Sequence, residues 1–295
     1  MTTTTTSPQL VDVTADDGAP RLHLGHLLRS ERIKMTSTKL WWLFGIAIIA
    51  ATGLALLQNI GTAYADLTVP GADTSSSAVA QESANIFTSG QYFGGLFVML
   101  FAILLITNEY HHQTATSTYL ATPRRTFVVI GKFVAAMMAA ATVWVVTTAL
   151  DLAFGSIFFA TTRFDAQFGA HVVQRAILIN LLMFALWAVF GVGIGALLRS
   201  QIGATVTATL LYTVGVLATL LVFALLRRFV FHTDAIFQGM VAVPSVAAQV
   251  AEDATHVPIP GNHIPPWWVG ALVMLGYGVV MAVVGTLILR KRDIS

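Results

Sequence analysis

The polar stretch from Thr107 to Lys132 groups side chains that could act in acid–base chemistry or metal binding. It holds Glu109, the adjacent pair His111-His112, a tract of Thr and Ser, and then Pro123-Arg124-Arg125. Histidine and carboxylate side chains are common metal ligands. However, neighbouring side chains on a helix point apart, and no second carboxylate accompanies Glu109. We therefore favour a solvated pair of histidines, with a metal site as the alternative.

A second group of potential metal ligands lies nearer the C-terminus, where Glu252 and Asp253 precede His256 and His263. These side chains could together hold a metal ion. Four prolines fall in the same region and favour a stiff loop instead, because proline fixes the backbone. They are Pro258, Pro260, Pro265 and Pro266.

Motifs for nucleotide binding and hydrolysis are absent from the sequence. A P-loop requires G-x-x-x-x-G-K-[ST], and Gly131-Lys132 lacks the upstream glycine at that spacing. Gly191-Val-Gly193-Ile-Gly195 superficially resembles a dinucleotide-binding turn, but it lies inside a predicted span and no strand precedes it. The small-x-x-x-small spacing of Gly191 and Gly195 instead predicts close helix packing. There is no Ser-His-Asp grouping, no H-E-x-x-H and no cysteine. We predict no catalytic, cofactor-binding or metal site in this chain.

The composition places these residues in a membrane protein. Of the 295 residues, 56% are hydrophobic and only 10% are charged, and the mean hydropathy is +0.76. A soluble domain carries about 25% charged residues, so this chain cannot cover a surface that faces water. The net charge of +2 is too small to suggest a nucleic-acid partner. We expect an all-α integral membrane protein with six transmembrane helices of about 20 apolar residues or more. The predicted spans are about residues 41–60, 87–106, 127–150, 171–198, 202–226 and 267–289.

Other segments complete the predicted organisation. Residues 1–20 are typical of a disordered tail, and 21–295 form one transmembrane domain. In residues 21–39, leucines alternate with basic side chains, which indicates an amphipathic helix in the membrane interface. A basic flank that only fixes the topology is the alternative. The apolar piece around residues 236–250 is too short to cross and return, and it predicts short helices that dip into or lie on the membrane surface.

Asp151 is an acidic residue within a long apolar run, so its depth in the membrane must be estimated. It lies 25 residues after Thr126, which is about 37 Å along a helix, whereas the hydrocarbon core is about 30 Å thick. We expect it at the far interface, with a functional carboxylate in mid-membrane as the alternative. An intramembrane enzyme would need polar residues within the apolar runs. The few polar residues that occur there are explained by helix packing. They are Thr142, Trp144, Asn180 and Thr205 to Thr209. The spans therefore predict no charged cavity.

The distribution of Lys and Arg predicts the orientation. If the N-terminus is inside, twelve of the sixteen basic residues fall on the inner side and four on the outer side. The inner residues are Arg21, Arg29, Arg32, Lys34, Lys39, Arg124, Arg125, Lys132, Arg199, Arg290, Lys291 and Arg292. The outer residues are Arg163, Arg175, Arg227 and Arg228. The positive-inside rule then places both termini and the polar stretch in the cytoplasm.

Four local patterns occur in one order along residues 25–295. The first is Ser30-Glu31-Arg32-Ile33-Lys34-Met35-Thr36-Ser37-Thr38 before Trp41-Trp42. The second is Glu109-Tyr110 followed by Thr116, Thr118, Leu120, Pro123, Arg124, Arg125 and Lys132. The third is the small-residue run from Gly191 to Ser200, and the fourth is Arg292-Asp293. With six spans, these patterns resemble the permease subunit of ABC-2 type transporters, which are bacterial ABC exporters.

The resemblance implies a division of labour. Two separate ATPase subunits would bind ATP and Mg, and two permease chains, identical or homologous, would pair among membrane lipids in the bacterial plasma membrane. Asn108 to Arg125 would form a cytoplasmic coupling helix docked on the ATPase, with Glu109 as a charge that anchors the partner or pairs with Arg124 or Arg125. The coupling residues would be Glu109, Tyr110, Thr116, Thr118, Pro123, Arg124 and Arg125, and those of the interface helix Glu31, Ile33 and Lys34. Residues 236–266 would correspond to the family's short external helices before the last span. The two arginines and many prolines of the linker 227–266 leave the boundaries of those helices open, and His111-His112 does not match the family pattern.

The function that the resemblance implies is export driven by ATP hydrolysis in the partner subunit. Because the spans carry almost no ionisable residues, we expect a hydrophobic or amphiphilic substrate such as a drug, peptide or lipid. A membrane scaffold or sensor that moves nothing is the alternative.

Overall fold

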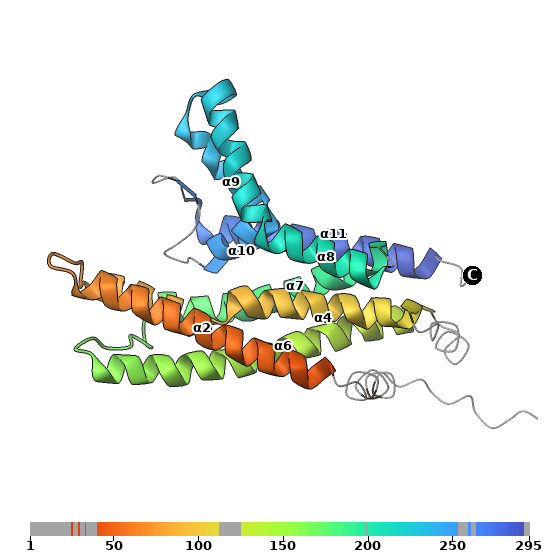
Figure 1. The fold of residues 1–295 in the computed structure, drawn as a ribbon, viewed down its shortest axis with the longest axis horizontal. Coiled ribbons are helices and arrows are strands. Elements are labelled where there is room, and N and C mark those ends of the chain that lie inside the picture. Colours follow the sequence, from red (N-terminus) through yellow and green to blue (C-terminus); the bar gives the residue numbers. More distant parts are fainter. Residues whose placement is uncertain are drawn as a thin grey trace, which may run out of the picture.

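The computed structural model describes residues 40–111, 125–198, 200–252, 259–260 and 264–291, together with Gly25, Arg29 and Ile33. Every regular element in these ranges is helical (Figure 1). The longer helices are α2 (Leu40–Thr68), α4 (Gln91–His111), α6 (Arg125–Thr161), α7 (His171–Leu198) and α11 (Trp267–Lys291). The shorter ones are α3 (Ser76–Phe87), α8 (Gln201–Thr213), α9 (Gly215–Leu226), η1 (Arg227–Phe231), η2 (Asp234–Ala242) and α10 (Pro244–Glu252).

The described part of the chain contains five helices that are long and apolar enough to cross a membrane, or up to seven if two bent pairs each count as a span. This establishes a multi-pass, all-helical membrane protein, and the predicted six spans fall within the range. The predicted span at 202–226 is the first bent pair, α8 and α9, which meet at 52°. Gly215 follows the break, and the Thr213 hydroxyl donates to the Thr209 carbonyl. Both features are known causes of helix bending.

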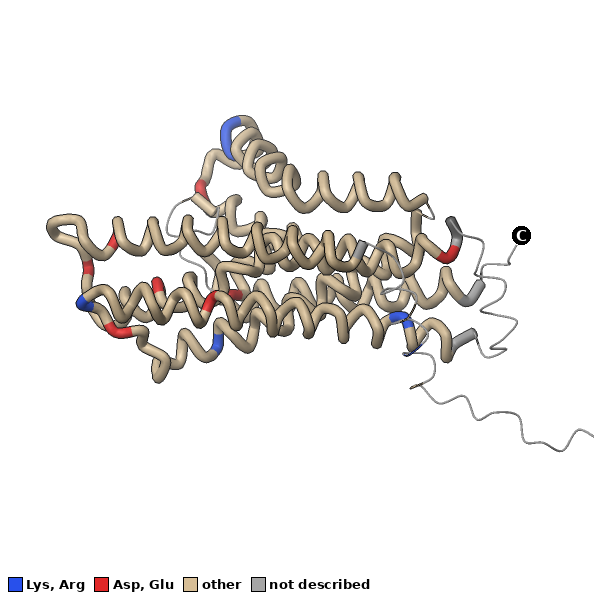
Figure 2. The backbone as a smooth tube through the Cα atoms, turned by 60° about the horizontal axis from the view of Figure 1, so that its bottom comes forward, with Lys and Arg blue, Asp and Glu red and all other residues tan. Residues whose placement is uncertain are grey.

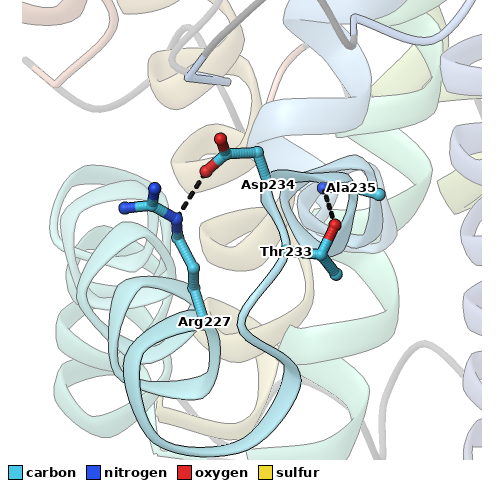
Figure 3. Close-up of polar contacts among 4 residues, drawn as sticks. All are labelled: Arg227, Thr233, Asp234 and Ala235. Carbon is cyan, nitrogen blue, oxygen red and sulfur yellow. Dashed lines mark hydrogen bonds and ion pairs between the residues drawn. The ribbon is translucent and has the colours of Figure 1, made fainter.

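Helix α9 leaves the bundle and the chain returns beside it through η2 (Figure 1). The turn between them is stabilised by an ion pair between Arg227 and Asp234, and the Thr233 hydroxyl accepts from the Ala235 amide at the start of η2 (Figure 3). Helices η2 and α10 then meet at 99°. Short helices are therefore present where the sequence predicted them, and α10 packs against α11.

Helix α7 lies at the centre of the bundle and packs most extensively against α4 and α11. A Cβ atom at Gly191 would collide with the Met99 carbonyl oxygen of α4, and one at Gly195 would lie 3.1 Å from the Ile103 carbonyl oxygen. Gly193, on the other side of α7, would meet Met281 of α11 at 2.8 Å. The alternating glycines thus let α7 approach two helices at backbone distance.

The long helices run roughly parallel to one axis, and their ends form two groups. The starts of α2, α6 and α8 and the ends of α4, α7 and α11 gather at the same end (Figure 1). We call this the terminal end of the bundle, and the other the distal end. Charged residues of the described chain concentrate toward these two ends, whereas the centre of the helices is almost free of them (Figure 2).

Candidate functional site: a buried ion pair and two cavities

A buried ion pair joins α4 to α6 at the terminal end. The Nζ atom of Lys132 lies 2.8 Å from Oε1 of Glu109, and the two side chains are only 2% and 7% exposed. Glu109 is in the last turn of α4 and Lys132 is in the second turn of α6, so the pair bridges the two helices that flank residues 112–124. Burial of two charges is costly unless they pair with good geometry. This contact therefore holds the two helix ends in a fixed relation.

The family resemblance suggested the ATPase, Arg124 or Arg125 as partners of Glu109, and Lys132 was not among them. The signal was present in the sequence, because an ionisable residue within an apolar span usually has a partner on a neighbouring span. Lys132 lies inside the apolar run of α6. Its distance along the chain from Glu109 obscured the pairing.

Most of the other predicted coupling and interface residues fall outside the described part of the structure. Ile33 is helical and 54% exposed. Tyr110 and Arg125 belong to α4 and α6, but their side chains are not described. The residues wholly outside the described ranges are Glu31, Lys34, Thr116, Thr118, Pro123 and Arg124. Their assignments stay predictions.

Asp151 is enclosed by the protein and serves the N-terminus of α4. Its Oδ2 atom accepts a 2.9 Å hydrogen bond from the Gly90 amide, which directly precedes α4, and the side chain is 1% exposed. The first amides of a helix lack partners within the helix, and the helix dipole favours a negative group there. A Cβ atom at Gly90 would lie 2.6 Å from the Thr147 Cβ, so glycine permits the approach. From the sequence, Asp151 was expected at the far interface, with a functional carboxylate in mid-membrane as the alternative. Capping of the α4 N-terminus was not among these roles.

A polar cavity of about 330 Å³ lies between α2, α3, α4, α8 and α10, beside the start of α4. Asn180 of α7 lies against it and donates to Gln91 Oε1 at 2.8 Å and to Glu252 Oε1 at 3.1 Å. The Tyr212 hydroxyl donates to the Tyr92 carbonyl oxygen at 2.8 Å. The cavity is lined by Gln58, Asn59, Asn85, Thr88, Ser89, Gln91, Tyr92, Tyr212, Ser245, Ala248, Gln249 and Glu252.

The sequence predicted no charged cavity, because the spans carry almost no ionisable residues, but one ionisable side chain, Glu252, lines this cavity. Glu252 lies outside the apolar runs from which that expectation was drawn, and the fold-back of η2 and α10 brings it against α4 and α7. The metal site proposed around Glu252 involves Asp253, His256 and His263, which lie outside the described residues. Within the described ranges, no three His, Asp or Glu side chains cluster as a metal site would require.

A second, apolar cavity of about 400 Å³ lies between α2, α4 and α6. Its wall is hydrocarbon and aromatic, apart from one threonine, and it is formed by Trp41, Phe44, Gly45, Ile48, Ile49, Phe97, Val98, Phe101, Ala139, Thr142, Val143 and Val146. Phe44 packs edge-on against Phe97, with ring centroids 5.7 Å apart. An apolar chain or ring, from lipid or substrate, fits such a wall.

The family model for the ABC-2 family transporter protein matches residues 27–216, which is more than half of the chain. The chain belongs to this family. The ABC-2 match covers the bundle from before α2 to the start of α9, including the Glu109–Lys132 pair and the glycines of α7. A comparison with curated proteins found no match.

Membership of the ABC-2 family identifies the chain as the membrane permease component of an ABC transporter, a class that works with ABC ATPase subunits. A permease component is not itself catalytic. The resemblance inferred from the sequence is thus confirmed at the level of the family.

Proposed function

We propose that this ABC-2 permease is the membrane half of a bacterial plasma-membrane exporter. In this proposal two ATPase subunits supply ATP hydrolysis, and a second permease chain, identical or homologous, completes the pathway. ATP and Mg bind in the ATPase subunits. The buried Glu109–Lys132 pair carries the proposal, because it fastens together the two helices on either side of the predicted coupling segment Asn108–Arg125.

The pair would make α4 and α6 move together as one rigid unit. Closure of the ATPase dimer on ATP would displace the coupling segment, and a fixed contact between the helix ends would pass that displacement to both helices. Helix α4 packs closely on the central helix α7 through the glycine contacts, so the motion would reach the middle of the bundle. Packed interfaces of this kind switch between discrete arrangements rather than deforming gradually.

The apolar cavity supports the hydrophobic or amphiphilic substrate expected from the sequence. It lies between α2 and the two helices of this proposed rigid unit, α4 and α6. A joint movement of α4 and α6 relative to α2 would change its shape and its access. The non-transporting scaffold remains the alternative that the experiment below separates from transport.

The experiment starts with co-purification of the permease and its candidate ATPase, followed by measurement of ATP hydrolysis in proteoliposomes. The test variant is Arg124→Glu with Arg125→Glu, which reverses two charges in the predicted coupling segment without touching the buried pair. The matched control is Arg227→Glu with Arg228→Glu, two exposed arginines at the turn after α9.

We expect the test variant to release the ATPase or to uncouple its hydrolysis, and the control to leave both unchanged. Substrate movement into inside-out vesicles, dependent on ATP, would establish export. An ATPase that stays bound and fully coupled in the test variant would contradict the position of the coupling segment. A stable complex that hydrolyses ATP but moves no substrate would favour the scaffold.

A further inference from the structure

The polar cavity beside the start of α4 has a chemical character that the rest of the bundle lacks. Carboxamides and hydroxyls of several helices converge on it, and Glu252 is the one charged side chain among the residues that line it. The Glu252 side chain is only 7% exposed. Among the described residues it accepts a hydrogen bond from Asn180, and no cationic side chain lines the cavity beside it. An ionised carboxylate can accept about four hydrogen bonds.

A second observation points to a missing ligand group. The Ser245 hydroxyl lines the same cavity, its residue is 5% exposed, and its oxygen has no hydrogen-bond partner within the described chain. An unpaired buried hydroxyl costs free energy that a bound ligand or a water can restore. Ser245 lies at the start of α10 and Glu252 at its end, so both side chains project from one short helix.

The cavity also carries two aromatic rings. Tyr92 and Tyr212 line it with ring centroids 5.3 Å apart. Aromatic faces attract cations through the ring quadrupole. A buried carboxylate, neutral acceptors and aromatic rings together match an ammonium group, which offers three donors and a positive charge. An anionic ligand would instead face an uncompensated carboxylate.

We propose that this cavity binds the ammonium group of a cationic substrate, such as a lysine side chain or free amine of a peptide. The inference rests on the proposed transport function in one respect only, the identification of the ligand as the transported substrate. A cavity of about 330 Å³ is at the lower end of the range for ligand sites, so it holds the amine-bearing part of a larger molecule. The apolar cavity between α2, α4 and α6 would suit the apolar part of the same amphiphile.

The test measures binding to the purified permease in lipid nanodiscs by calorimetry, with no ATPase or nucleotide present. The probe is the blocked peptide N-acetyl-Gly-Lys-Gly-amide, whose single charge is the lysine ammonium. The comparison probe is the same peptide with an acetylated lysine side chain. We expect the charged probe to bind at least about tenfold more tightly, as a charge-assisted hydrogen bond would give.

Two variants locate the site. Glu252→Gln keeps an oxygen that can accept from Asn180 but removes the charge, and it is expected to abolish the preference for the charged probe. Glu82→Gln is the matched control, because Glu82 is equally buried but does not line the cavity. Ser245→Ala, which removes the unpaired hydroxyl, is expected to weaken binding of both probes while the protein stays folded, and it remains informative if Glu252→Gln does not fold.

Equal affinity for the two probes, no binding of the charged probe, or an unchanged preference in Glu252→Gln would each overturn the proposal and leave a cavity filled by water. Because binding is measured on the permease alone, these outcomes do not depend on ATPase coupling. Conversely, a failure to recruit an ATPase would contradict the transport function and leave the binding site intact.

Discussion

The Glu109–Lys132 pair gives the sharpest prediction about what holds the terminal end of the bundle together. Lys132→Met replaces the cation by an apolar side chain of similar length and leaves the Glu109 carboxylate buried without its partner. At 2.8 Å and an effective dielectric constant of about 20, the attraction is about 6 kcal/mol, much of which is offset by desolvation of the two charges. We expect a loss of about 3–5 kcal/mol in the free energy of unfolding.

The single change Glu109→Gln is expected to cost a similar amount, because it leaves Lys132 charged and buried. The double variant, Glu109→Gln with Lys132→Met, removes both charges. Replacing a buried pair by neutral groups of similar volume is often nearly neutral. The double variant is therefore expected to be more stable than either single variant, with an interaction energy of at least about 2 kcal/mol.

The assay is denaturant unfolding of all four proteins in the same detergent micelles, followed by tryptophan fluorescence. The control cycle uses the exposed pair of Arg227 and Asp234, whose side chains are 52% and 56% exposed. Exposed pairs contribute about 0–1 kcal/mol, so this cycle should show little coupling. Additivity of the Glu109 and Lys132 changes within about 0.5 kcal/mol would refute the argument that they interact as a buried pair.

The remaining predictions test the packing of the bundle. Gly191→Leu is expected to lower the free energy of unfolding by at least about 3 kcal/mol or to prevent folding, because its Cβ atom would collide with the α4 backbone. Gly276→Leu is the control, because Gly276 has open space around it, and it should be tolerated. Both variants are compared in the same thermal-stability assay. Asp151→Ala should lower the free energy of unfolding by about 1–3 kcal/mol, because it leaves the Gly90 amide unpaired. Asp151→Asn keeps an acceptor and should restore most of the loss. Equal stability of the two variants would contradict the capping role. Arg227→Ala is expected to change stability by no more than about 1 kcal/mol, and a larger loss would show that the turn after α9 is part of the core.

Local sequence determined the membrane class of this protein and most of its helices. An apolar run of about 20 residues must satisfy its backbone within itself in lipid, so the runs that become α2, α4, α6, α7 and α11 could be located from composition alone. The spacing of Gly191 and Gly195 predicted a close helix contact for a similar reason, since only small residues allow backbones to approach. The order of short motifs indicated the ABC-2 family, which the family match then established.

Tertiary structure alone decided which polar residues meet. The apolar helices are hydrophobic on all sides, so their sequences carry no amphipathic pattern that would reveal the face toward each neighbour. Glu109 therefore had several possible partners until α4 and α6 were placed side by side, and the capping of α4 by Asp151 depends on contacts 61 residues apart. The polar cavity depends on the 99° turn between η2 and α10, which brings Glu252 to Asn180 although the two lie 72 residues apart. Composition dictates that a segment enters the membrane, but the pairing of buried polar groups is a property of long-range packing.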